Sequence, residues 1–302
     1  MEQEKGIKFQ LMTRTEAVKF LSERNNYLRI ASYRKNYQKH NGKYCDLDFK
    51  CLVELSTLDM HLRNLIMKMT ISIEHCLKVK LIRDIEMDPR EDGYSIVNSF
   101  FDIPKNRYII NDIVRKASSQ YSGDLIQHYF NYSVEFGPDG KEIYRFDCPA
   151  WVLIEVISFG AFIKFYEHFY QNGRKPQIQV EMLNSVKSLR NACAHNNCIM
   201  HDLKSSNKTA PKGRIVKAVK KISTIGSGQR NKKLSNQFIL EFVTLLYVYD
   251  SVVSEDVKKH TYKELRNFSE HRLIRHIDYF GTQSLVKTSI DFLHKVIDFY
   301  AQ

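Results

Sequence analysis

Arg190, Asn191 and His195 are the side chains of this sequence whose types and spacing best suit chemistry on a phosphodiester. Histidine transfers protons near neutral pH because its ordinary pKa is about 6.5. The planar guanidinium of arginine stays charged and binds two phosphate oxygens together, and a neutral amide can position a phosphate or a 2′-OH. Metal-free cleavage of RNA needs only such groups: a base for the 2′-OH, an acid for the leaving 5′-oxygen and a cation for the phosphate.

The Arg-x4–6-His spacing is weak evidence when it is taken alone, because segments 34–40 and 266–271 show it as well as segment 190–195. The last segment differs in its context. It ends a predicted amphipathic helix over 179–195, and only small residues separate the polar pair from the histidine, so another helix or a phosphate backbone can approach closely. The other two segments lie in charged stretches that are typical of solvated surface. A structural histidine at a helix end is the default for an arbitrary protein, but this context favours a functional one.

Helix geometry constrains how Arg190 and His195 can act together. At about 100° per residue, positions five apart lie roughly 140° apart around a helix. The two side chains therefore share no face unless the helix frays at His195. Two copies of the helix would bring together two arginines and two histidines, of which one could be the base and the other the acid. We therefore expect a homodimer, and an active monomer would remove this expectation.

Hydrophobic periodicity predicts one all-α domain over residues 1–302, with a small β-hairpin insertion at 132–146. The longest helix is expected within 47–86, and a helix that is apolar nearly all round is expected over 149–170. Further helical patterns follow a capping-box spacing at residues 13–16, and occupy 26–39, 93–101, 108–130, 236–253 and 284–300.

Residues 203–234 contain lysines and arginines but no acid, with Ser, Gly and Pro scattered among them. This composition predicts a basic loop or mobile insertion and not a packed helix. A plain solvated loop and an RNA-gripping arm are equally good interpretations. The candidate RNA-binding residues of this segment are Lys204, Lys208, Lys212, Arg214, Lys217, Lys220 and Lys221.

A second basic stretch, residues 26–37, interleaves cations with tyrosines that could contact phosphates and stack on bases. A helix that buries its tyrosines and turns its charges to water explains the pattern slightly better. The candidate RNA-binding cations of this stretch are Arg29, Arg34 and Lys35, and its rings are Tyr27, Tyr33 and Tyr37.

Several charged residues lie within otherwise apolar predicted helices. Asp59, Arg63 and Glu74 are interpreted either as buried ion partners or as the lining of a cleft. Glu155 is expected to be paired, because burying a lone charge is costly.

The composition favours a polyanionic partner, because the 302 residues carry a formal net charge of +12 and a pI of about 9.3. A basic surface kept for solubility is the alternative. No run of about 18 apolar residues and no signal peptide is found, so a cytoplasmic location is expected. The six cysteines show no C-x-x-C pair and no zinc-finger spacing, so we expect neither disulfides nor a metal, and no cofactor.

Four blocks of the sequence resemble a known family. SLRNACAHNNCI (188–199) resembles the Arg-x4–6-His motif of HEPN domains, with Asn after the Arg. The other blocks resemble the Abi (abortive infection) family in its AbiD/AbiF-like branch, and the similarity covers about 20–300. These blocks are NYLRIASYRKNY (26–37), LDMHLRNLIMKMTISIEHCLKVKL (58–81) and PAWVLIEVISFGAFIKFYEHF (149–169).

The resemblance implies an all-helical HEPN fold, commonly dimeric with the paired motifs facing each other. Arg190, Asn191 and His195 match the functional positions of the family. It further implies a metal-independent endoribonuclease that acts in antiviral defense or as a toxin restrained by a partner. Because this branch looks related to the HEPN nuclease parts of RNA-guided CRISPR effectors, a structured non-coding RNA is a credible partner.

A non-catalytic binder of a structured non-coding RNA, using the same basic cleft, is the alternative function. In that case the purified protein would leave RNA intact, and variants of the motif would lose affinity. A DNA-binding regulator is less well supported, because no helix-turn-helix pattern stands out. A membrane-surface role is weaker still, because the basic residues do not gather opposite an apolar helix face.

Overall fold

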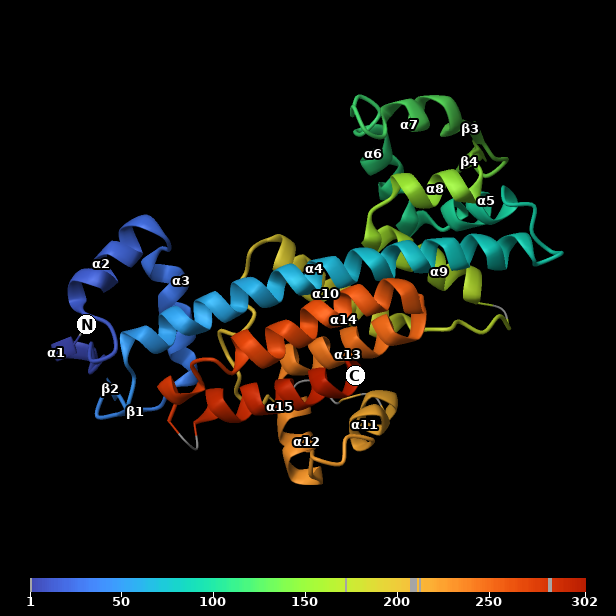
Figure 1. The fold of residues 1–302 in the computed structure, drawn as a ribbon. Coiled ribbons are helices and arrows are strands. Elements are labelled where there is room, and N and C mark those ends of the chain that lie inside the picture. Colours follow the sequence, from blue (N-terminus) through green and yellow to red (C-terminus); the bar gives the residue numbers. More distant parts are fainter. Residues whose placement is uncertain (1, 172, 207–210, 212, 282–283) are drawn as a thin grey trace. The chain divides into compact units, whose positions relative to one another are not determined.

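The computed structural model describes residues 2–171, 173–206, 211, 213–281 and 284–302. In these ranges the chain is mostly helical, with two antiparallel sheets of two strands each (Figure 1). The predicted all-α class and its small hairpin insertion are therefore confirmed.

The backbone forms two compact units, which are residues 1–72 with 185–302 and residues 73–184. Helices α4 (Phe49–Glu86) and α10 (Val180–Ala194) each contribute to both units. The single domain expected over 1–302 remains a prediction.

The first unit contains the ends of the chain, the beginning of α4 and the end of α10. Its helix α2 starts at the predicted capping box, in which Thr13 and Glu16 bind each other's backbone amides. The elements of this unit outside α4 and α10 are α1 (Glu2–Lys5), α2 (Arg14–Glu23), α3 (Tyr27–Ser32), a 3-10 turn (Tyr33–Asn36), β1 (Lys39–His40), β2 (Lys43–Tyr44), α11 (Gly213–Lys220), α12 (Ser227–Leu234), α13 (Gln237–Val252), α14 (Glu255–Asn267), a π-helical turn (Phe268–Leu273), a 3-10 turn (Ile277–Tyr279) and α15 (Leu285–Tyr300).

The second unit contains the predicted hairpin, whose strands pair from Asn131 with Asp147 to Phe136 with Glu142. One side of this hairpin and the short helices around it share an aromatic core. The elements of this unit outside α4 and α10 are α5 (Ser95–Asp102), a 3-10 turn (Pro104–Asn106), α6 (Tyr108–Val114), α7 (Gly123–Tyr129), β3 (Asn131–Phe136), β4 (Glu142–Asp147), α8 (Ala150–Val156) and α9 (Phe159–Tyr170).

Helix α4 forms because apolar side chains recur at every third or fourth position. Leu58, Leu62 and Ile66 in the first unit, and Ile73 and Leu77 in the second, are at most 1% exposed. Burying each such side chain contributes about 1.5–3 kcal/mol. The helix expected within 47–86 is confirmed almost residue for residue.

The continuous helix expected over 149–170 is wrong, because the chain breaks at Ile157 and Ser158. Both residues have extended backbone, and the Ser158 hydroxyl accepts a hydrogen bond from the Ala161 amide at 3.2 Å. The serine thereby caps α9 and separates it from α8. Both helices remain largely buried, which the apolar pattern did indicate.

The basic loop expected over 203–234 is also wrong in large part, because the segment contains α11 and α12. In α11 the apolar residues Ile215, Ala218 and Val219 are buried at helical spacing while the cations between them stay exposed. The many cations of this segment made its short amphipathic pattern of apolar residues hard to recognise. Lys208 and Lys212 lie outside the described residues.

Two other expected helices are shorter than predicted. The segment 26–39 is helical only to Asn36, after which β1 and β2 pair across a turn whose Asn41 and Gly42 have φ of 49° and 79°. The segment 108–130 forms α6 and α7 with a bend between them.

Helix α13 lies in the core of the first unit, where α11, α12 and α15 contact it (Figure 1). Every residue from 238 to 246 is buried, so this helix is apolar nearly all round. Among the described helices, none combines the length and the apolar character needed to cross a membrane.

Candidate functional site

The motif helix α10 ends in a regular Schellman turn. Its last residue is Ala194, and Asn196 adopts the left-handed conformation with φ of 56°. The Asn197 amide donates to the Ala192 carbonyl at 2.8 Å, and the Asn196 amide donates to the Cys193 carbonyl at 2.9 Å. Asn tolerates this conformation better than most residues. The helix is therefore closed at His195 and does not fray there.

The three motif side chains reach solvent at this helix end. Asn191 and His195 are exposed, and Arg190 is half-buried. The Arg190 Nη1 donates to the Asn191 Oδ1 at 3.2 Å. Because residues four apart lie about 40° apart on a helix, Asn191 and His195 share a face, and Arg190 leans toward it from the side. None of the three side chains is sealed in the core, and chemistry on an RNA requires this access to solvent.

Arg29 of α3 fastens the residue that follows the histidine. Its Nη1 donates to the Asn196 carbonyl at 2.5 Å, and its Nη2 donates to the Asn196 Oδ1 at 3.1 Å. A cation at the C-terminal end of a helix is favourable, because the unpaired carbonyls there carry partial negative charge. This predicted RNA-binding residue is therefore placed beside the motif, with a positioning role that the sequence did not indicate.

A buried ion pair on α4 holds the chain just after Asn196. The Arg63 Nη1 donates to the Asp59 Oδ2 at 2.7 Å and to the Asn197 carbonyl at 2.9 Å. The other Asp59 oxygen accepts from the Met200 amide at 2.7 Å. Burial raises the pKa of Asp59, and the Met200 amide and Arg63 oppose that effect. Of the two interpretations open from the sequence, the buried ion pair is confirmed for Asp59 and Arg63.

Two asparagines continue this support along residues 200–204. The Asn36 side chain bonds to the Met200 carbonyl at 3.0 Å and to the Leu203 amide at 2.8 Å. The Asn236 amide group donates to the carbonyls of Asp202 and Lys204 at 3.0 and 2.8 Å. Both asparagines are buried, so each bond replaces one that water would otherwise make. Sequence reasoning missed both residues.

The family of the chain follows from a comparison with known proteins. The sequence model of the Abi-like protein family matches residues 19–201, more than half of the chain. The chain belongs to the Abi-like protein family. This membership indicates a role in abortive infection, a form of phage defence. No curated protein and no solved structure matches the chain.

The family region of this Abi-like protein contains the motif and most of its supports. It starts before Arg29, includes Asp59 and Arg63, and ends directly after Met200. Asn236 lies outside the matched region.

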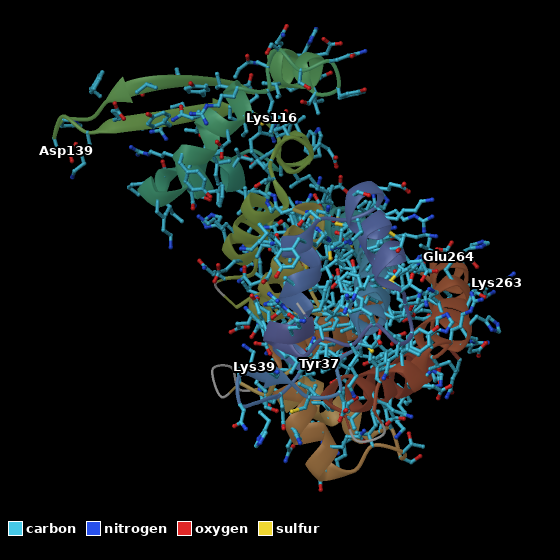
Figure 2. The ribbon with its side chains drawn as sticks, turned by 90° about the vertical axis from the view of Figure 1, so that its left-hand side faces the viewer. Tyr37, Lys39, Lys116, Asp139, Lys263 and Glu264 are labelled. Carbon is cyan, nitrogen blue, oxygen red and sulfur yellow. The ribbon has the colours of Figure 1, made fainter. Side chains whose placement is uncertain are left out.

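Arg34, another candidate near the N-terminus of the Abi-like protein, lies in a small patch of cations and tyrosine rings. The Arg34 guanidinium lies 5.6 Å from the Tyr27 ring centre, and Lys39, marked in Figure 2, has its Nζ 4.8 Å from the Tyr44 ring centre. Lys35 is exposed. Tyr33 is fully buried and cannot stack on a base, whereas Tyr27 is 38% exposed.

The predicted RNA-binding cations of residues 203–234 lie in two different places. Arg214, Lys217, Lys220 and Lys221 are exposed on α11 and just beyond its end, and form one basic helix face. Lys204 lies instead in the segment held by Asn236, close in sequence to the motif. The structure therefore brings Arg29 to the motif and places the α11 cations on a separate helix.

The acids of the second unit also differ from their predicted surroundings. The Lys78 Nζ lies 3.6 Å from the Glu74 Oε1 and 3.6 Å from the Glu155 Oε2, so Glu155 is paired as expected. The Glu155 side chain is nevertheless 57% exposed and not buried. Within the described part of the chain, no group of three or more His, Cys, Asp or Glu side chains is arranged to hold a metal ion.

Proposed function

We propose that this Abi-like protein is a phage-defence endoribonuclease of the HEPN type that works without a metal at Arg190, Asn191 and His195. One observation carries the proposal: three groups suited to RNA cleavage reach solvent at the end of a closed helix. That helix end is held by Arg29, Arg63 and further buried side chains. Such fixed placement is what proton transfer at a defined atom requires.

Each motif residue has a distinct part in this chemistry. The imidazole of His195 takes the proton of a 2′-OH or returns one to the leaving 5′-oxygen. Arg190 stabilises charge on the phosphate, and Asn191, on the face of His195, positions the phosphate or the 2′-OH. One chain supplies one such histidine, so we propose that a homodimer provides both the base and the acid. An active species with the mass of a monomer, measured by light scattering, would exclude this arrangement.

The cleavage assay compares the wild type with His195→Ala and Arg190→Ala on total RNA in EDTA. We expect the wild type to produce ends with a 2′,3′-cyclic phosphate, and both variants to lose this activity while RNA affinity and fold persist. His271→Ala is the matched control, because His271 is exposed and belongs to a segment of the same Arg-x4-His spacing. Equal activity of wild type and His195→Ala would refute the proposal.

A second candidate function is the binding of a structured non-coding RNA without cleavage. The exposed basic face of α11 and the patch of Arg34 and Tyr27 favour it, because both suit phosphate or base contacts. Under this function the wild type leaves RNA intact and the motif variants lose affinity. Sequencing of the nucleic acid that copurifies with the protein identifies the partner in either case, including an RNA that restrains a toxin.

A further inference from the structure

A cavity of about 360 Å³ adjoins the motif helix within the first unit. Leu189 and Ala192 of α10 form part of its wall, and these residues directly neighbour Arg190 and Asn191 in the sequence. The rest of the wall comes from two segments: residues 197–206, which follow the motif, and residues 236–241 at the start of α13. A volume near the lower end of the range for ligand sites suits one small planar group.

The cavity combines apolar walls with a few polar groups, as binding sites for small planar ligands do. Leu189, Ala192, Ile199 and the aromatic ring of Phe238 supply apolar surface. The polar groups come from α13 and from the chain after the motif. The arrangement can hold a flat ring between apolar surfaces while its edge meets hydrogen-bonding groups.

Glu241 is the most unusual of these polar groups. It is 7% exposed, lies in the nearly wholly apolar helix α13, and accepts a hydrogen bond from the Gln237 Nε2 at 2.7 Å. Within the described part of the chain, no lysine, arginine or histidine forms an ion pair with it. Burial raises the pKa of Glu241, while Gln237 and Ser188 oppose that effect. Burying a carboxyl without a cation costs stability, even where hydrogen bonds satisfy part of it.

His201 adds a second polar group of defined orientation. Its Nδ1 lies 2.6 Å from the Cys198 carbonyl oxygen. A carbonyl only accepts hydrogen bonds, so Nδ1 is the donor here and Nε2 is left for another partner. Lys204, exposed on the same wall, can meet a phosphate.

We propose that this cavity binds one unpaired nucleobase of a single-stranded RNA whose backbone lies at the motif. The inference deepens the proposed function and rests on it for the identity of the RNA as substrate or partner. Carboxyl and amide groups match the donors and acceptors on the edge of a base, and Phe238 gives its ring an aromatic surface. The position of the cavity against α10 gives the base a fixed distance from the motif, so the site sets a sequence preference.

Binding tests this proposal apart from cleavage. The parent is His195→Ala, so that RNA stays intact, and the probes are fluorescent 12-nucleotide RNAs that carry each base in turn or one abasic residue. We expect the parent to bind one base type best and the abasic probe roughly tenfold more weakly. Glu241→Gln and Phe238→Leu in this parent should bind all probes at about the abasic level. The slope of log affinity against log salt should not change, because the phosphate contacts remain.

Controls separate the inference from a folding defect and from the proposed nuclease. Glu23→Gln, an exposed change on α2, should keep the base preference, and thermal unfolding should show that all variants fold. Equal affinity of the parent for the abasic and intact probes, or unchanged preference in both cavity variants, overturns the inference. Competition by a free nucleoside monophosphate as strong as by the RNA would also overturn it, in favour of a nucleotide site. If the wild type fails to cleave RNA while the base preference persists, only the nuclease proposal fails.

Discussion

The buried pair of Asp59 and Arg63 gives a sharp test, because its two members can respond differently to the loss of their partner. Their side chains are 0% and 8% exposed, and together they hold the carbonyl of Asn197 and the amide of Met200. Removing one member of a buried pair costs about 3–5 kcal/mol when the other stays charged. Arginine cannot lose its proton, so Asp59→Asn should lower the free energy of unfolding by this full amount.

Arg63→Met should cost less at acidic pH, since Asp59 can become neutral by taking up a proton. Burial already raises the pKa of Asp59, and the loss of Arg63 raises it further above the unfolded value of about 3.9. Between these two pKa values the folded state binds more protons than the unfolded chain. The free energy of unfolding of this variant should therefore fall as pH rises through that window.

Urea unfolding followed by circular dichroism between pH 5 and pH 8 measures both effects. Lys8→Met breaks the exposed pair of Lys8 and Asp46 and serves as the control, for which a loss of at most about 1 kcal/mol is expected. A loss of less than 1 kcal/mol in Asp59→Asn, or a stability of Arg63→Met that rises with pH, would show that the pair is not the anchor described above.

Three further predictions concern other parts of the first unit. Burial lowers the pKa of Lys233 from 10.5 to about 8, so between these values the unfolded chain binds more protons than the folded chain. The free energy of unfolding should therefore rise with pH in that window. Urea midpoints should show this rise in the wild type and not in Lys233→Met. Asn196→Val should cost about 1–2 kcal/mol more than Asn196→Gly in thermal unfolding, because both variants lose the bond from Arg29 but only Val is strained at a φ of 56°, and equal losses would contradict this cause. If α11 binds phosphates, a variant with Gln at its four exposed cations should bind RNA with a flatter slope of log affinity against log salt, by about 0.7 for each phosphate that is no longer neutralised. These cations are Arg214, Lys217, Lys220 and Lys221. An unchanged slope would show that this face does not bind RNA.

The elements that sequence reasoning found are those in which one apolar period runs unbroken. Helix α4 is the clearest case, because its buried leucines recur through the whole span. The break at Ser158 escaped it, since a serine in an apolar run caps a helix only where the backbone turns extended. Helix α11 was missed because its short buried pattern is interrupted by lysines that dominate the composition.

The candidate site divides in the same way. Arg190, Asn191 and His195 could be chosen because they are close in sequence and end a recognisable helix. Asn36 and Asn236 could not, because their partners are backbone groups far away along the chain. Glu241 left a usable signal, a lone acid in an apolar helix, and the same signal drew attention to Glu155 instead. Apolar neighbours in the sequence do not show which side of a helix faces water, and Glu155 lies on the solvent-exposed side of α8.

The fastening of residues 200–204 by Asn236 has a consequence for synthesis of the protein. A ribosome that has just added His195 has made the three motif residues. It has not yet made Asn236 and α13, which hold residues 202 and 204. Incomplete chains can therefore make the contacts of Arg29, Arg63 and Asn36, but they lack those of Asn236 until α13 emerges and packs. Under the proposed function, the last of these supports is thus in place only after α13 has been made.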